Sequence, residues 1–275
     1  MDIPWHTELA KLWLESCRKE RAPHAVLLTG PVGVGKRAAA AWMAAQRLKR
    51  DAKAALPAHP VERFEHPDLH WLLTPEDKKS IGIEQIRALV GELSLTSYQG
   101  FGKVAVIEPA NDMTISAANS LLKTLEEPPG DALMILIADR IGKLPATIIS
   151  RCQRIDIAVP AETIALQWLD RLHPGAAWLD ALRSAGGAPL AAIDALEALE
   201  TTNALGRDLQ VLGQGRGSAV EVAARWAKLD PSLVLNWLAQ QVRLLALANA
   251  AGREMAQGLA IDESVANPAG RITFN

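Results

Sequence analysis

The chain has 275 residues, two cysteines and a formal net charge of −2. This length predicts two or three domains, and the charge argues against a protein that binds nucleic acid through a strongly basic surface of its own. Two cysteines exclude a disulfide framework, and no apolar run approaches the roughly 20 residues of a membrane helix, so we expect a cytoplasmic protein without membrane contact.

Strand and helix patterns alternate over the first 158 residues. Helical spacing predicts helices at residues 7–20, after residue 36, and around 83–93 and 115–125. Apolar runs predict strands at residues 24–29, 69–73, 103–107 and 132–137. Such alternation favours parallel pairing through right-handed crossovers, which predicts a parallel α/β sheet with helices on both faces.

The first predicted strand leads into the sequence GPVGVGKR, which resembles a phosphate-binding loop. Gly30, Gly33 and Gly35 would let backbone N–H groups turn toward a phosphate, and Lys36 would add a positive charge beside the start of a helix. Arg37 occupies the position at which a Ser or Thr hydroxyl normally holds magnesium. The sequence therefore predicts a loop of the nucleotide-binding type and leaves open whether it binds a nucleotide.

The third predicted strand is followed by Glu108 and Pro109. A nucleotide hydrolase needs acidic residues beside its loop, one to hold magnesium and one to polarise the attacking water. Glu108 suits the first role, whereas Pro109 has no side chain that can act as a base. Glu108 is also consistent with an ordinary acid at a strand end.

Three histidines, His59, His66 and His70, lie close together in the sequence. His66 and His70 are four residues apart, but Pro67 and the predicted strand exclude the helical geometry that brings such a pair together. We therefore expect histidines at the surface or at strand ends, and no metal site.

Beyond residue 160 the composition changes to Ala and Leu, and predicted helices replace strands. Gly or Pro breaks occur near residues 174, 186–189, 213–217 and 231. We expect an α/β domain at residues 1–159, a small helical lid at 160–204 and a helical segment at 205–275.

The sequence NSLLKTLEEPPGDALMILIADRIGKLPATIISRCQRIDI, residues 119–157, strongly resembles the clamp-loader ATPases of the AAA+ class. Together with HPDLHWL at residues 66–72 and AGGAPLAAI at 185–193, it resembles the delta-prime family of the bacterial DNA polymerase III clamp loader. The resemblance covers about residues 5–200 well, and the remainder only as a helical tail. It implies a AAA+ P-loop-type sheet, a helical lid, and a helical collar through which the subunits form a hetero-oligomeric ring.

The resemblance places the Walker A motif at Gly30–Arg37 and the Walker B acid pair at Glu108 and Pro109. The lid position at which motor members carry an arginine falls near Pro189, with no arginine beside it. Three parts needed for hydrolysis within the subunit are therefore changed. The resemblance implies a subunit without catalysis of its own in the DNA-directed DNA polymerase III holoenzyme, which requires no cofactor and binds ATP or ADP weakly if at all.

Ser150, Arg151 and Cys152 fall on the family motif that gives an arginine finger to a neighbouring ATPase. The implied partners are the motor (gamma/tau) and delta subunits, with the sliding clamp and primed DNA reached through the complex. The role implied for the chain is that of a stator, which helps to load the clamp during replication while Arg151 acts in trans.

Two other functions fit parts of the sequence, namely an active motor-type ATPase and a stand-alone AAA+ switch or DNA-repair protein. Arg37, Pro109 and the missing lid arginine favour the stator over the motor. Many relatives carry four zinc cysteines after the P-loop helix, but residues 47–65 contain none, so we expect no zinc. The tail after Gly206 is short for a collar, and the sequence leaves open whether residue 275 is the natural end.

Overall fold

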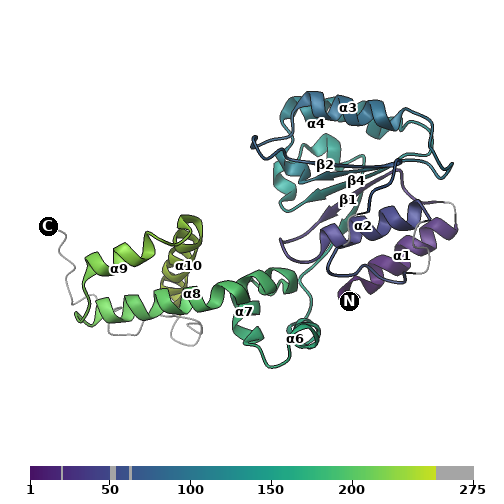
Figure 1. Cartoon of the computed structure of the whole chain (residues 1–275). Coiled ribbons are helices and arrows are strands. Elements are labelled where there is room, and N and C mark those ends of the chain that lie inside the picture. The colour runs from purple at the N-terminus through teal and green to yellow at the C-terminus, as the bar shows by residue number, and fades with distance from the viewer. Residues whose placement is uncertain (20, 50–53, 62–63, 252–275) are drawn as a thin grey trace. The chain divides into compact units, whose positions relative to one another are not determined.

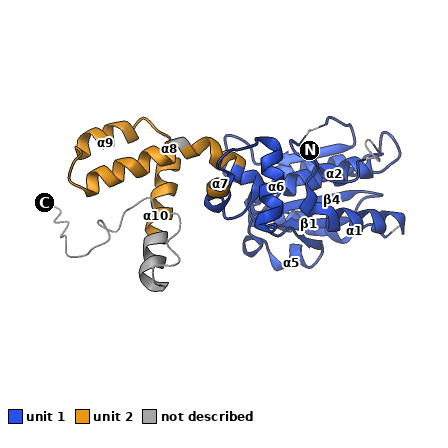
Figure 2. Cartoon of the chain, turned by 90° about the horizontal axis from the view of Figure 1, so that it is seen from below, with its two compact units in different colours: residues 1–178, 182–192 blue, residues 179–181, 193–275 orange. Residues whose placement is uncertain are grey.

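A computed structural model describes residues 1–19, 21–49, 54–61 and 64–251. The chain divides into two compact units (Figure 2). The first contains residues 1–178 and 182–192, and the second contains residues 179–181 and the described residues from 193 onward. No helix in the described part is long and apolar enough to cross a membrane.

A five-stranded parallel sheet with the order β2-β3-β4-β1-β5 forms the centre of the first unit (Figure 1). Its strands are β1 (Ala25–Thr29), β2 (Leu69–Leu73), β3 (Val104–Glu108), β4 (Leu133–Ala138) and β5 (Gln153–Asp156). The predicted parallel α/β sheet is confirmed. Each strand predicted from an apolar run lies within one residue of its observed bounds. β1, β3 and β4 are buried on both faces and therefore read as apolar runs, whereas β2 at the sheet edge is half-buried.

Helices cover both faces of this sheet, with α1 and α2 on one face and α3 and α4 on the other (Figure 1). The helices from the N-terminus through the sheet are α1 (Thr7–Arg18), α2 (Lys36–Arg47), α3 (Ile83–Leu93), α4 (Ile115–Glu126) and α5 (Ala146–Ile149). After β5 follow α6 (Glu162–Leu172), α7 (Trp178–Ser184), α8 (Pro189–Gly213), α9 (Ala219–Trp226) and α10 (Pro231–Ala251). Short 3-10 turns are η1 (Pro4–His6), η2 (Ala110–Asp112) and η3 (Ile141–Lys143).

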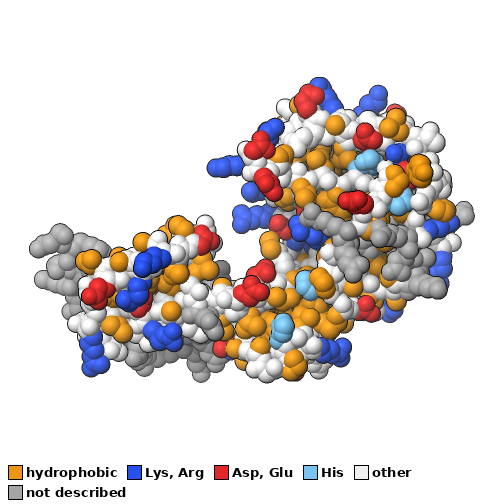
Figure 3. All heavy atoms as spheres, viewed as in Figure 1, with side chains coloured by type: hydrophobic (Ala, Val, Ile, Leu, Met, Phe, Trp, Pro, Cys, Tyr) orange, Lys and Arg blue, Asp and Glu red, His pale blue; other side chains and the backbone are white. Residues whose placement is uncertain are grey.

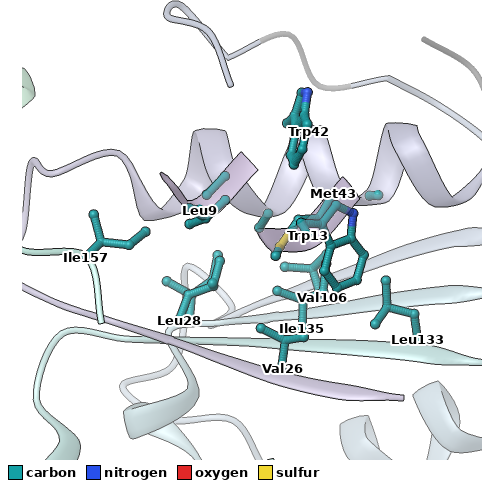
Figure 4. Close-up of a cluster of buried hydrophobic side chains, with 14 of the residues drawn as sticks. Leu9, Trp13, Val26, Leu28, Trp42, Met43, Val106, Leu133, Ile135 and Ile157 are labelled. Atoms are coloured by element: carbon teal, nitrogen blue, oxygen red, sulfur yellow. The ribbon is translucent and has the colours of Figure 1, made fainter. Parts of the chain in front are cut away.

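Successive residues of the strands belong in turn to two hydrophobic clusters, one on each face of the sheet. Val26 and Ile135 point toward α1 and α2, where they meet Trp13 and Met43 (Figure 4). Leu27, one residue along β1, belongs to the cluster under α3 and α4. Both faces are therefore dry, and the polar groups available for function lie where the strands end.

Asp68, just before β2, anchors the loop that leads into β3. Its side chain is fully buried and accepts hydrogen bonds from Tyr98 N (2.9 Å), Gln99 N (3.1 Å) and Ser97 Oγ (3.1 Å). Lys103, also buried, brings its Nζ to 3.7 Å from the carboxylate. The burial cost of this charge is offset by three donors and one cation, so the carboxylate fixes the loop conformation.

The second unit contains most of α8, together with α9 and α10. Leu205, Val234 and Trp237 form its buried cluster, and Asp208 on α8 accepts hydrogen bonds from Arg225 Nη2 (2.5 Å) and Trp226 Nε1 (2.9 Å). α8 runs unbroken past residue 204, where the sequence predicts a domain boundary. The proposed division into an α/β domain, a lid and a tail remains a prediction, and residues 252–275 of that tail lie outside the described part.

Charged side chains of both signs are interspersed on the visible face of the first unit (Figure 3). This mixture agrees with the net charge of −2 over the whole chain. No continuous basic surface is visible on the described residues in this view.

Candidate functional site

The glycine-rich loop lies between β1 and α2, as the sequence predicts. Gly30, Gly33 and Gly35 have φ angles of +143°, +84° and +93°, which side chains rarely allow. A Cβ atom on Gly30 would lie 2.1 Å from the carbonyl oxygen of Ile157, and one on Gly33 would lie 2.4 Å from the Cβ of Ala191. The glycines are therefore required both for the turn and for the close approach of neighbouring backbone.

Lys36 uses all three of its ammonium protons within the protein. Its Nζ donates to the backbone oxygens of Gly30 (2.7 Å) and Pro31 (2.6 Å), and lies 2.7 Å from Oδ1 of Asp139. An ammonium group has three donors, and the side chain is only 5% exposed. A phosphate can reach this charge only by displacing one of these three oxygens, of which only that of Asp139 is anionic.

Arg37 and Glu108, the residues that the resemblance assigns to the Walker A and Walker B motifs, form an ion pair. Arg37 Nε lies 2.8 Å from Oε1 and 2.9 Å from Oε2 of Glu108, and Trp71 Nε1 donates to Oε2 at 3.0 Å. Glu108 is nearly buried, whereas Arg37 is about half exposed. The carboxylate that would hold magnesium in a hydrolase is thus neutralised by a fixed guanidinium.

A pocket of about 920 Å³ opens beside these residues. The charged groups of the loop, the carboxyl end of β3 and the carboxyl end of β4 line it together. They are Lys36, Arg37, Glu108 and Asp139, with Pro109 beside them. The structure therefore brings together the predicted loop and strand-end residues, whereas Arg151 is not among the described residues that line this pocket.

The first turn of α8 contacts the glycine-rich loop directly. Leu190 N donates a hydrogen bond to the backbone oxygen of Gly33 at 2.9 Å, and Ala191 packs against the same glycine. Pro189, where the resemblance places the missing lid arginine, begins this helix. The lid position thus meets the loop through backbone and small side chains, and Pro189 brings no positive charge to the pocket.

The N-terminal turn η1 covers the other side of the loop. Trp5 Nε1 and His6 Nε2 both donate to the backbone oxygen of Val34 at 2.9 Å, and a Cβ on Gly35 would lie 2.9 Å from His6 Cε1. His6 is almost fully buried, and burial lowers its pKa to about 4. The imidazole is therefore neutral near pH 7, with the proton on Nε2.

We expect this histidine to make stability depend on pH. Below pH 6.5 the unfolded chain binds a proton at His6, while the folded state stays neutral down to about pH 4, so acid favours unfolding over that window. The contribution is about 1.4 kcal/mol for each pH unit within it. Denaturant unfolding of the wild type and of His6→Gln at pH 7, 6 and 5 should show a shallower pH dependence for the variant. Parallel curves would contradict the assignment.

The segment with Ser150, Arg151 and Cys152 follows α5 and lies against the end of α4. Arg151 Nε donates to Oε1 of Glu126 at 2.7 Å, its Nη2 pairs with the same carboxylate, and its Nη1 donates to the backbone oxygen of Thr147 at 3.0 Å. Ser150 Oγ also donates to that oxygen, and burial raises the pKa of the Cys152 thiol to about 11. Arg151 is thus held within the chain while one third of its side chain stays exposed.

Comparison with known proteins places the chain in a family. A family model described as "DNA polymerase III, delta subunit" matches residues 5–161. The chain belongs to this DNA polymerase III subunit family. "DNA polymerase III subunit delta'" of Pseudomonas aeruginosa is 38% identical over 199 residues, which are 69% of this chain and 60% of the relative. The protein of the same name from Haemophilus influenzae is 35% identical over 182 residues, 63% of this chain and 55% of the relative.

These relatives confirm the resemblance to delta-prime subunits. The chain matches less than two thirds of the length of either relative. Among solved structures, that of a RuvB mutant from Thermotoga maritima is similar with a TM-score of 0.51 at 17% identity, covering 94% of this chain and 82% of that one. This likeness concerns the fold, and it agrees with the predicted fold class, a parallel α/β sheet followed by helices.

Several residues at the site were not identified from the sequence. Asp139 directly follows β4, so the rule that parallel strands present their carboxyl ends at one edge could have paired it with Glu108. Trp71 and His6 gave no such signal, because their contacts depend on how distant segments pack. The described residues contain no group of three or more His, Cys, Asp or Glu side chains that could hold a metal, so the three histidines considered as ligands do not belong to one.

Proposed function

We propose that this chain is the non-hydrolysing delta-prime subunit of a DNA polymerase III clamp loader. In this role it acts as a stator that helps to load the sliding clamp onto primed DNA during replication. Membership of the DNA polymerase III family and the delta-prime names of its relatives support the assignment. Its proposed partners are the motor (gamma/tau) and delta subunits of a cytoplasmic hetero-oligomeric ring.

The contact of Arg37 with Glu108 is the observation that carries the non-hydrolysing role. Phosphoryl transfer needs a cation that bridges the phosphates, held by a hydroxyl and an acidic side chain. Here the hydroxyl position carries Arg37, whose guanidinium binds the acidic side chain itself. Pro109, at the next position, offers no group to polarise water.

The same pocket keeps parts of a nucleotide site. The three glycines hold the loop in its turn, and Lys36 lies beneath it with its ammonium group on Asp139. Weak binding of ATP or ADP that depends little on magnesium therefore remains a prediction, because the loop amides and the lysine are kept, whereas the hydroxyl ligand of magnesium is absent and Glu108 is paired with Arg37.

We expect the isolated chain to hydrolyse ATP no faster than background and to join motor and delta subunits in a reconstituted complex. The physical reason is the loss of both the magnesium hydroxyl ligand and the water-polarising acid. Phosphate release by the isolated chain and complex formation by size-exclusion chromatography measure the two parts.

The control for hydrolysis is Lys36→Ala, which removes the charge that any nucleotide site in this loop would use. ATP turnover by the wild type that disappears in this variant would show a working motor and reject the stator role. A chain that stays monomeric beside motor and delta subunits would instead support a stand-alone protein.

A further inference from the structure

The C-terminal end of α4 carries a charge where an α-helix disfavours it. Glu126 is the last residue of the helix, Glu127 follows it, and two prolines end the helical segment. The last carbonyl groups of a helix form the negative end of its dipole, so two carboxylates there are unfavourable. A departure from a local rule of this kind often marks a residue kept for another purpose.

Glu126 and Glu127 differ sharply in their contacts. The carboxylate of Glu126 accepts a hydrogen bond from Nε of Arg151 and forms an ion pair with its Nη2. Arg151 lies 25 residues later, in a different segment of the chain. Among the described residues, the side chain of Glu127 has no hydrogen bond or ion pair. Only the first of the two glutamates is thus placed to act on the arginine.

The way in which Glu126 holds Arg151 leaves one donor of the guanidinium free within the described part of the chain and a second only weakly engaged. A guanidinium has five N–H donors in a planar fork. Glu126 takes Nε and one donor of Nη2, and Thr147 O takes one donor of Nη1 at 3.0 Å. The second donor of Nη2 has no partner among the described residues, and the second donor of Nη1 makes a long hydrogen bond of 3.4 Å to Ser150 Oγ.

We infer that Glu126 is a positioning residue. It binds Nε and Nη2 of the Arg151 guanidinium and so directs the remaining donors of Arg151 to phosphate oxygens held by the neighbouring subunit. This inference rests on the proposed trans role of Arg151. A planar fork matches two phosphate oxygens at once only when its orientation is fixed, and a long side chain otherwise loses that orientation to rotamer freedom. Glu126 acts through Arg151 and does not itself reach the phosphate.

The test compares variants in the fully assembled clamp loader. The rate that depends on Arg151 is defined as the ATPase rate of the wild-type complex minus that of the Arg151→Ala complex. Glu126→Ala should lower kcat for this rate about tenfold and leave the KM for ATP within about twofold, because orientation matters most in the transition state. Glu126→Gln should keep most of the rate, since its amide oxygen still accepts from Nε.

Two further variants separate positioning from folding. Glu127→Ala removes the same charge from the same helix end and should leave the rate unchanged. Glu126→Lys places a favourable charge at the helix end yet repels Arg151, so the complex should assemble while the rate falls at least as far as with Glu126→Ala. In the Arg151→Ala background, Glu126→Ala should have no additional effect.

The outcomes distinguish this inference from the proposed function. A normal rate for both Glu126→Ala and Glu126→Lys, or an equal loss with Glu127→Ala, would overturn the positioning role while the loss with Arg151→Ala upholds the finger. An additional loss in the double variant would show that Glu126 acts other than through Arg151. A normal rate with Arg151→Ala in an assembled complex would overturn both the finger and its positioning.

Discussion

Arg151→Ala is expected to leave the chain folded and able to join the ring, yet to lower DNA- and clamp-stimulated ATP hydrolysis by the adjacent motor subunit. Arginine fingers accelerate hydrolysis roughly 10³–10⁵-fold at the site that they serve, so ATP hydrolysis at that site should nearly stop. Other sites in the ring keep their own machinery, which limits the loss in total turnover. Clamp loading should slow as well, because the motor beside this chain no longer completes its cycle.

The measurement pairs ATPase and clamp-loading rates with proof of assembly by size-exclusion chromatography. Arg151→Lys should restore little activity, because an ammonium group cannot bind two phosphate oxygens as a planar fork does. Arg87→Ala is a matched control, since Arg87 is exposed and forms an intrachain ion pair with Glu84 at 2.9 Å. Unchanged rates with Arg151→Ala in an assembled complex would make the pair with Glu126 a purely structural contact.

The largest expected effect on stability belongs to Asp68→Ala, which should lower the free energy of unfolding by about 3–5 kcal/mol. The substitution leaves Lys103 buried without its carboxylate and removes the acceptor for two backbone amides, whereas the Ser97 hydroxyl still has the backbone oxygen of Gly102 at 3.1 Å. Lys103 is buried, and a buried charge that is left unpaired costs much more than the average hydrogen bond contributes.

Guanidinium unfolding monitored by tryptophan fluorescence provides the measurement. Asp68→Asn is the matched variant, because it keeps one acceptor oxygen and the shape of the side chain while losing the charge. We expect the free energy of unfolding of Asp68→Asn to lie between those of the wild type and Asp68→Ala. A loss below about 1 kcal/mol for Asp68→Ala would show that the loop at residues 97–100 relaxes around the missing carboxylate.

The sheet could be predicted from the sequence because its signal is local. Strands such as β1 and β4 are buried on both faces and therefore appear as apolar runs, and the glycine-rich turn before α2 follows from residue spacing alone. The extent of α8 was harder to predict, since Gly206 lies two residues beyond the boundary predicted at residue 204, yet α8 continues through it to Gly213.

The candidate site was predictable residue by residue but not as a set of contacts. Arg37 could be identified as a departure from a hydrolase motif, and Glu108 as a match to one. Nothing in the sequence indicates that these two positions, 71 residues apart, are in contact. The contacts of His6 with Val34 and of Glu126 with Arg151 likewise depend on the packing of segments that the sequence separates. Local patterns report which element a residue occupies, and tertiary packing decides what its side chain meets.

The ion pair of Arg37 and Glu108 also constrains how this protein can evolve. Exchanging Arg37 for a hydroxyl residue would return the phosphate-loop motif to its usual form, but would leave a nearly buried carboxylate with only the indole N–H of Trp71. The effects of substitutions at two residues in contact are not additive. Here, replacing either Arg37 or Glu108 alone would leave the other charge without its partner, which lowers stability. If the chain has the proposed non-hydrolysing role, a change toward an ATP-driven motor would therefore need a bound metal ion to replace the guanidinium in the same step.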